Sequence, residues 1–155
     1  MRLHETVREM AFALYAASLG MGPPVLAAVS WAEMPSATTN LHYGLLLVLE
    51  RCRGDMIDFQ CSVREKFPPA SYVSGPSPEF TRAAVDAAKD VARLCYRSAR
   101  EGFLNFDIKP ANVLWQEGTT FYLCDFDPTH LLQVHTSMAS MKAAFFLNML
   151  LLCMH

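Results

Sequence analysis

The sequence has little charge, and it has none in runs. Asp, Glu, Lys and Arg make up 18% of its 155 residues, below the roughly 25% of an ordinary soluble domain. The net charge is -2, and the basic residues are scattered singly along the chain. Binding a nucleic-acid backbone needs clustered Lys and Arg, so we expect no nucleic-acid partner. With 52% apolar residues, the chain can bury the core of one small globular domain.

Metal-binding cysteine patterns are also absent. None of the five cysteines belongs to a C-x-x-C pair, which a zinc finger needs in addition to its histidines. We therefore expect neither a zinc site nor a redox dithiol, and we interpret the five histidines as surface or packing residues. Because an odd cysteine count favours a reducing compartment, we expect an intracellular, cytoplasmic protein.

No hydrophobic run is long enough to cross a membrane. Residues 143–154 are apolar apart from Asn148, but a membrane span takes about 20 residues, so we expect a buried helix there. Residues 10–21 have the apolar character of a signal peptide, yet Glu5 and Glu9 precede them where such a peptide is basic. We therefore expect neither a secretion signal nor a membrane span.

Hydrophobic periodicity divides the first part of the chain into a helix and two strands. Apolar residues recur every three or four positions over residues 5–19, which predicts a helix that ends at the glycines and prolines of 20–24. Residues 25–31 predict a short strand and residues 34–40 a polar turn. Residues 41–50 are continuously apolar, so we expect a central strand that is buried on both faces. A short helix or loop is expected to follow as far as Val63.

The second part of the chain is expected to hold a long helix and a hairpin. Four prolines and a glycine over residues 67–78 predict an irregular connection, after which Ser77 would cap a helix at 78–100. Strands are expected at residues 103–106, 113–115 and 119–124. The last two would pair antiparallel across a turn at residues 116–118.

The predicted hairpin brings polar groups together at one of its ends. Asn112 precedes its first strand and Asp125 follows its second, so both lie at the same end, and Asp107 and Lys109 stand on the incoming loop. Carboxylate and amide oxygens are hard ligands of the kind that Mg²⁺ prefers, and an ammonium group suits a phosphate. The pattern therefore predicts phosphoryl-transfer chemistry. The alternative is that both carboxylates only form turns, in which Asp is common.

These residues resemble two motifs of the protein kinase-like superfamily. NFDIKPANVL at residues 105–114 is similar to the catalytic loop H-R-D-L-x-x-x-N, and CDFD at residues 124–127 is similar to D-F-G. The resemblance implies ATP and Mg²⁺ as cofactors. Asp107 would orient or deprotonate the attacking hydroxyl, and Lys109 would steady the transferring γ-phosphoryl group. Asn112 would hold one Mg²⁺, and Asp125 would bridge the phosphates through the metal.

The resemblance also implies an α+β, kinase-like fold in truncated form. Residues 1–52 would be a remnant small lobe that runs from the regulatory helix to the hinge. Residues 53–155 would be a partial, mainly helical large lobe with the catalytic β-hairpin, resting on the last helix. Leu49 would stand at the gatekeeper position, with Glu50, Arg51 and Cys52 at the adenine edge. Glu9 is the expected acid of an ion pair with a phosphate-contacting lysine, and Glu5 is its competitor.

Departures from the family motifs leave several functions open. The sequence has no G-x-G-x-x-G loop, no V-A-I-K lysine and no A-P-E motif, so we expect part of a kinase domain. Its expected function is ATP-dependent transfer of the γ-phosphate to a protein or small-molecule hydroxyl, as a fragment of a longer domain. The alternative is a catalytically impaired, pseudokinase-like binding module with a protein partner covering its incomplete lobes. A truncated product without function is the third interpretation.

Two substitutions inside the motifs bear on regulation and on the acceptor. Phe106 replaces the arginine that receives an activation-loop phosphate in the family, so we expect no regulation by that phosphorylation. Asp127 replaces the glycine of D-F-G and adds a carboxylate beside the expected metal site. In this respect the chain is more similar to the divergent and small-molecule branches of the superfamily than to ordinary protein kinases.

Overall fold

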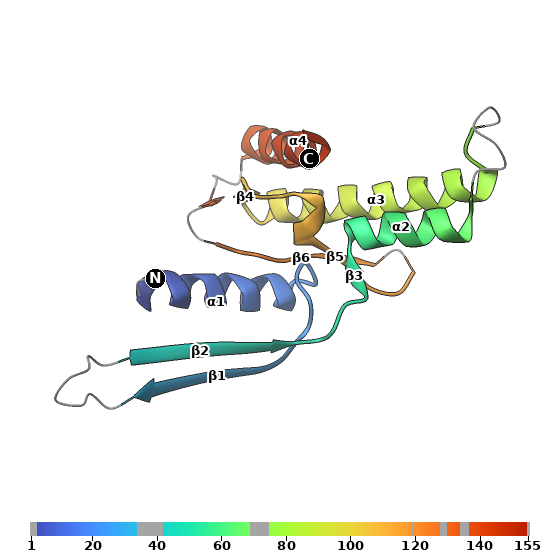
Figure 1. Ribbon diagram of the computed structural model, residues 1–155. Helices are drawn as coiled ribbons and strands as arrows, with labels where there is room; N and C mark the ends of the chain where they lie inside the picture. The colour runs from blue at the N-terminus through green and yellow to red at the C-terminus, as the bar shows by residue number, and fades with distance from the viewer. Residues whose placement is uncertain are drawn as a thin grey trace.

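The computed structural model describes residues 3–33, 42–68, 75–118, 120–127, 130–133 and 137–154. They form a mixed α+β structure of helices and small antiparallel sheets. Figure 1 shows the elements stacked in layers, with α4 (Met138–Met154) at one side, then α3 (Pro78–Arg100) and α2 (Met56–Lys66). Short strands follow, then α1 (Leu3–Ser18), and finally the ribbon of β1 and β2. The α+β class expected from the sequence is confirmed.

The expected first helix and the two strands after it are present. Helix α1 ends before Gly20, whose φ of +66° is the left-handed conformation common just beyond a helix end. Strand β1 (Val25–Glu33) then pairs antiparallel with β2 (His42–Leu49), and the two form a sheet of their own. The predicted polar turn at residues 34–40 lies outside the described residues.

Strand β2 is not the central, doubly buried strand that the sequence led us to expect. Its pairing within the described residues is with β1 alone, and the side chains of Leu46 and Val48 are 51% and 40% exposed. Alternate residues face α1 and the neighbouring cavity, whereas the other face is open. The prediction was wrong because a continuous apolar run records composition but not the number of neighbouring strands.

The two middle helices have well-formed starts. In α2, the Asp55 carboxylate accepts from Asp58 N while the Asp58 carboxylate accepts from Asp55 N, which is a reciprocal capping box. In α3, the Ser77 hydroxyl accepts from Phe80 N at 3.1 Å, which confirms the predicted cap. Of the connection predicted at residues 67–78, only residues 67–68 and 75–77 precede α3 within the described part, and they are not helical.

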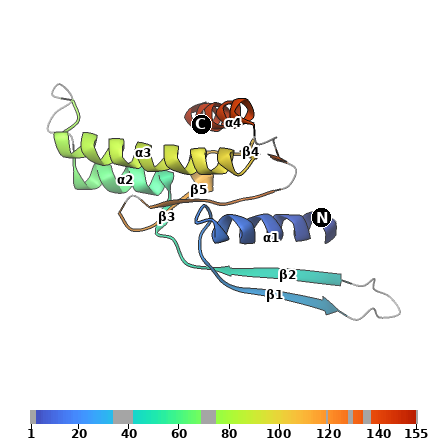
Figure 2. The ribbon, with the colours of Figure 1, turned by 180° about the vertical axis from the view of Figure 1, so that it is seen from behind.

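The short strands of the hairpin lie beneath α3. Strand β5 (Val113–Trp115) pairs antiparallel with β6 (Phe121–Leu123), as expected, and β3 (Gly54–Asp55) joins the other edge of β5. Strand β4 (Phe103–Asn105) pairs with β7 (Leu131–Gln133), which lies beyond the candidate metal motif. Figure 2 shows the same arrangement from behind. The strands fix both ends of the loop that carries the predicted site.

The hydrophobic core lies between α3, the hairpin and α1. Its buried members come from elements far apart in the sequence: Ala16, Met21, Phe59, Ala87, Val91, Leu94, Cys95, Phe103, Ile108, Val113, Phe121, Leu123 and Leu152. Phe12 of α1 meets Phe103 of β4 edge to face, with ring centroids 5.5 Å apart. Residues from both predicted lobes therefore share one core.

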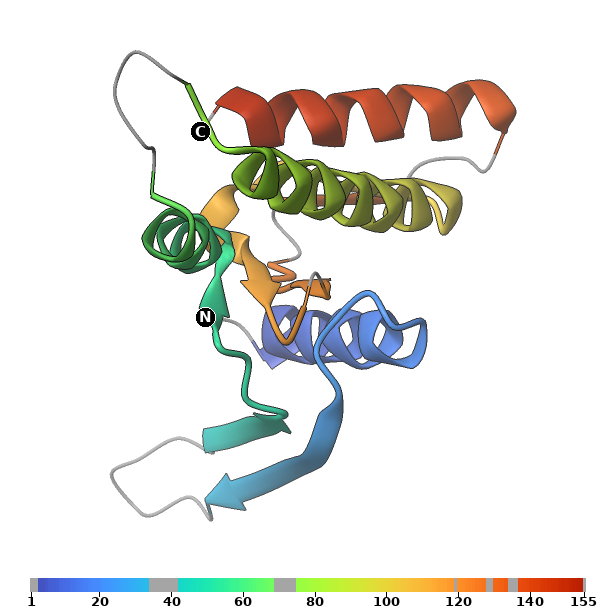
Figure 3. The same ribbon diagram turned by 90° about the vertical axis from the view of Figure 1, so that its right-hand side faces the viewer.

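Helix α4 is only partly buried, which corrects the prediction of a buried helix over residues 143–154. Ala144, Asn148 and Leu152 face α3 and the core, but Phe146 and Leu150 are 67% and 56% exposed. Figure 3 shows α4 lying along one side of α3 with its outer face uncovered. No helix within the described ranges is both long enough and apolar enough to cross a membrane.

Candidate functional site

The loop between β4 and β5 holds the predicted catalytic residues in place through its buried members. Ile108 is fully buried in the core, so the chain on either side of it must run along the surface of that core. A single 3-10 turn, η1 (Pro110–Asn112), follows, with Pro110 at its first position, where the missing N–H is tolerated. The turn ends at Asn112, immediately before β5.

The four residues predicted to form the site are brought together. Lys109 Nζ lies 2.9 and 2.8 Å from the two carboxylate oxygens of Asp107. Asn112 Nδ2 donates to Asp107 Oδ2 at 2.9 Å and to Asp125 Oδ2 at 3.4 Å. The amide of Asn112 therefore bridges the two carboxylates, and one hydrogen-bonded cluster contains Asp107, Lys109, Asn112 and Asp125.

The hairpin explains why Asn112 and Asp125 meet. Val113 is in register with Leu123, so the residues flanking this pair lie at the same end of the hairpin. Cys124 N–H donates to the carbonyl of Asn112 at 3.0 Å, which extends the pairing by one step. Burial raises the pKa of the Cys124 thiol to about 11, so the thiol is protonated and donates to the same carbonyl. Asp125 is the next residue.

Asp107 and Lys109 stabilise each other's charged state. The hydrogen bond from Lys109, opposed in part by desolvation, lowers the pKa of the Asp107 carboxyl below its usual 3.8. The same hydrogen bond raises the pKa of the Lys109 ammonium above 10.5. Both side chains keep contact with solvent, at 25% and 36% exposure. At neutral pH the site therefore presents an ionised carboxylate with a cation beside it.

Asp125 has an unusual backbone. Its φ is +59°, the only positive value among the described residues other than glycine. A left-handed conformation at a residue with a Cβ is strained, and such strain is typical of functional sites, where surrounding structure maintains it. The side chain is exposed and available to a ligand.

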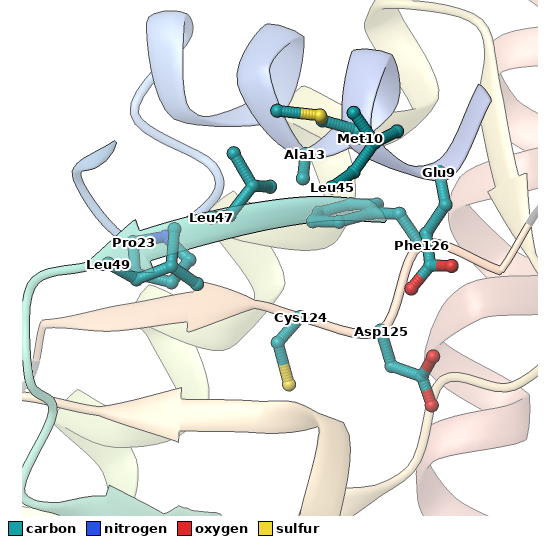
Figure 4. A pocket seen from close by; sticks show the side chains of 10 residues that line it. All are labelled: Glu9, Met10, Ala13, Pro23, Leu45, Leu47, Leu49, Cys124, Asp125 and Phe126. Carbon is teal, nitrogen blue, oxygen red and sulfur yellow. The ribbon is translucent and has the colours of Figure 1, made fainter. Parts of the chain in front are cut away.

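A cavity of about 340 Å³ opens beside Asp125. Its apolar wall comes from α1, from the turn after it and from alternate residues of β2: Met10, Ala13, Pro23, Leu45, Leu47 and Leu49. The opposite side is Cys124, Asp125 and Phe126. In Figure 4 the carboxylates of Glu9 and Asp125 lie at the same end of the cavity, away from Leu49 and Pro23. The cavity therefore has a long apolar part and one acidic end.

Glu9 faces other acids at that end. Partial burial, and then the charges of Asp125 and Asp127, raise the pKa of the Glu9 carboxyl above 4.5. No Lys or Arg forms an ion pair with it in the described part of the chain, so its predicted pairing with a lysine stays a prediction. The side chain of its competitor, Glu5, lies outside the described residues.

The predicted hinge begins at Leu49, the last residue of β2, at the far end of the cavity. Of its four residues, only Leu49 lines the cavity. Glu50 N–H donates to the Pro24 carbonyl, and the Glu50 carboxylate accepts from Gln116 Nε2 at 2.9 Å. Arg51 is exposed. Cys52 is half-buried, and burial followed by the charge of Glu50 raises the pKa of its thiol. The segment thus connects the ribbon to the hairpin.

Two residues that support the site were not foreseen as part of it. Asn148 of α4 is fully buried, and its Oδ1 accepts from Asn105 N–H at 3.3 Å. His130, interpreted as a surface or packing residue, is exposed but near enough for its charge to favour the ionised form of Asp107. The isolated asparagine in an apolar helix was the signal for Asn148, because a polar residue there needs a partner.

Comparison with known proteins leaves the family open, since neither a family model nor a curated protein matches the chain. Within the described ranges, no three residues drawn from His, Cys, Asp and Glu are grouped so as to hold a metal ion. The oxygens of Asp125 and Asn112 are of the type that Mg²⁺ takes, together with waters and phosphate oxygens, so two protein ligands fit such an ion.

Proposed function

We propose that the chain carries the metal and phosphate half of an ATP-dependent phosphotransferase of the protein kinase-like superfamily. The reaction would transfer the γ-phosphate of ATP to a hydroxyl group of a protein or a small molecule. One observation carries the proposal: the Asn112 amide joins Asp107 to Asp125, and Asp125 stands at the acidic end of the cavity. A nucleotide in that cavity would present its phosphates to the cluster.

The residues of the cluster divide into two roles. Asp125 and the amide oxygen of Asn112 would hold Mg²⁺, which would neutralise charge on the phosphates when bound. Asp107 would accept the proton of the attacking hydroxyl, and Lys109 would stay close enough to balance the negative charge of the transferred group. The mutual contact of Asp107 and Lys109 keeps the carboxylate ionised, as a proton acceptor must be.

The shape of the cavity supports a nucleotide as the ligand. Leu45, Leu47 and Leu49 form an apolar wall that suits a base, and the carboxylates of Glu9 and Asp125 lie at the other end. Among the described residues, the backbone N–H and carbonyl groups of Cys52, three residues after Leu49, form no hydrogen bond with another backbone group. They would be available to the edge of an adenine, as the kinase-like resemblance implies.

A second function is favoured by the surroundings of Glu9. In the proposed family this acid would pair with a lysine, but here the described charges that act on it are those of Asp125 and Asp127, and the sequence has no V-A-I-K lysine. A chain of this kind could bind Mg²⁺ and nucleotide without transferring phosphate. The second candidate is therefore a nucleotide-binding module of pseudokinase type.

Calorimetry of ATP binding in the presence and absence of Mg²⁺ tests the shared part of both functions. We expect saturable, Mg²⁺-dependent binding by the wild-type chain and at least a roughly tenfold weaker affinity in Asp125→Asn, which loses a charged ligand. Asp86→Asn is the matched control, because it removes the same charge from the exposed pair with Lys89 on α3. Binding by Asp125→Asn equal to that of the wild type would contradict the proposal, as would a folded chain that does not bind.

The Asp107→Asn variant separates the two candidates. It keeps the size of the side chain and the Mg²⁺ ligands but removes the proton acceptor, so a phosphotransferase should bind ATP and lose turnover of the γ-phosphate. Turnover is measured as release or transfer of labelled phosphate. If the wild type binds ATP and its turnover equals that of Asp107→Asn, the binding module is the function that stands.

A further inference from the structure

Asn105 supports Asp107 directly. It lies at the end of β4, its side chain is 2% exposed, and its Oδ1 accepts from the backbone N–H of Asp107 at 2.9 Å. This hydrogen bond closes a two-residue turn that sets the direction in which the chain leaves the strand. The position of the Asp107 carboxylate therefore depends on which way the amide of Asn105 points.

The NH₂ group of the Asn105 amide has no hydrogen-bond partner among the described residues. Asn105 Nδ2 is buried, and no described atom accepts a hydrogen bond from it. Buried side-chain donors in folded proteins are nearly always satisfied, by protein or by ordered water. The amide cannot simply turn over, because its NH₂ group would then face the N–H of Asp107, and two donors repel. An acceptor for Nδ2 is required for the observed orientation.

A small cavity lies beside Asn105. Its volume is about 10 Å³, and it is lined by Asn105, by Ser98 of α3 and by apolar residues of α1, β4, β6 and β7, among others. Ser98 is 3% exposed, and its Oγ is 3.4 Å from the Phe103 carbonyl, to which it donates. The hydroxyl can therefore still accept a hydrogen bond. A space of this size with two polar groups suits one water molecule.

We propose that one buried water, held between Asn105 Nδ2 and Ser98 Oγ, locks the Asn105 amide in the orientation that positions Asp107. The water accepts from the amide and donates to the serine hydroxyl, which in turn donates to the Phe103 carbonyl. Asn105 is thus a positioning residue, and Ser98 acts on Asp107 without touching it. The consequence for phosphate transfer rests on the proposed function, whereas the water site itself does not.

Nuclear magnetic resonance of the isotope-labelled chain tests the site without nucleotide. The Asn105 side-chain NH₂ hydrogens should show cross-peaks to a long-lived water, and hydrogen exchange reports the protection of Asp107 N–H. In Ser98→Ala the water loses one of its two polar partners, so the cross-peaks should disappear and exchange at Asp107 N–H should rise roughly tenfold. Ser18→Ala is the matched control, since Ser18 is an exposed helix serine bonded to the Tyr15 carbonyl.

Destabilisation of the core has to be separated from loss of the water. Leu152→Ala weakens the packing of α4 in the core without altering a polar group, so it should lower the melting temperature and leave Asp107 N–H protected relative to amides of α3. The proposal is overturned if the wild-type NH₂ hydrogens show no bound water. It is also overturned if Leu152→Ala exposes Asp107 N–H as selectively as Ser98→Ala does. A folded wild-type chain that fails to bind ATP would count against the proposed function and not against this site.

Discussion

The loop that carries the site is less apolar than the β1–β2 ribbon, yet it is anchored by more deeply buried aliphatic side chains. Around the loop, Ile108 and Val113 are fully buried, and the polar side chains of Asp107 and Asn112 are held by short hydrogen bonds. On the ribbon, Leu26 and Trp31 are 65% and 49% exposed. Whether a hydrophobic side chain is buried depends on the elements that pack on it and not on its hydrophobicity alone. The two regions should therefore respond differently to the same mutation.

The sharpest test of this comparison removes an aliphatic side chain from each region. Ile108→Ala should lower the free energy of unfolding by about 2–5 kcal/mol, because it leaves a cavity at a site packed on all sides. Leu26→Ala should change it by no more than about 0.5 kcal/mol, because the side chain is mostly in water. Chemical denaturation measures both values. Equal losses would mean that the ribbon is as well packed as the loop.

The capping box of α2 lies at the junction between the two regions. Removing it measures how much this junction contributes to the stability of the chain. Asp55 pairs with Leu114 in the β3–β5 ladder and also caps α2. Asp55→Ala should destabilise the chain by about 1 kcal/mol, the usual value for loss of an N-cap. Asp55→Ser can still accept from the helix N–H groups and should recover most of that loss. Thermal or chemical denaturation measures the stability of both variants. If Asp55→Ser is no more stable than Asp55→Ala, the capping role is contradicted.

Acid should weaken the loop through Asp107. Its pKa is lower in the folded chain than the usual 3.8, so its contribution to stability is present above that value. The contribution is lost as the pH falls through the folded pKa, because protonation ends the attraction to Lys109. The effect should be small, since both groups are partly in water.

Melting temperatures between about pH 5 and pH 2 measure this contribution. The wild type should lose stability more steeply than Asp107→Asn, and the two curves should converge at the acid end. Lys109→Met removes the partner and should flatten the curve in the same way. Parallel curves for the wild type and Asp107→Asn would show that the pair adds nothing to stability.

The smallest expected effect is on the ribbon. A Cβ at Gly44 would lie 1.9 Å from the ring of Trp31, so Gly44→Ala must displace that ring. Because Trp31 is half exposed, its ring can move toward solvent, so stability should change by less than about 0.5 kcal/mol. Fluorotryptophan NMR of the two tryptophans should show the Trp31 signal shift, with Trp115 as the internal reference. An unmoved Trp31 signal would contradict this packing.

The parts of the fold that follow from local chemistry were predicted well from the sequence. The convergence of Asn112 and Asp125 needed only the register of one hairpin, and the cap at Ser77 needed only its own turn. Long, strongly periodic segments such as α3 were also recovered, since 3.6-residue periodicity is a local property. The kinase-like resemblance of the site stays a prediction.

What the sequence failed to predict depends on distant neighbours. The exposure of Leu46 reflects how few strands lie beside β2, and the exposure of Phe146 reflects how little packs on α4. The contact between Asn148 and Asn105 joins residues 43 positions apart, which no local pattern encodes. Burial of an apolar run can therefore be predicted only together with the elements that would cover it.

A buried cysteine in the core can report how often the core opens. Cys95 is fully buried in α3, and burial raises its pKa to about 12, so at neutral pH it is a protonated thiol within the hydrophobic core. Cys61 and Cys153, on α2 and α4, are exposed. Alkylating reagents will therefore modify the two surface thiols first, because only an accessible thiolate reacts. The slower rate of Cys95 modification will then measure how often α3 leaves the core. No engineered label is needed for this measurement.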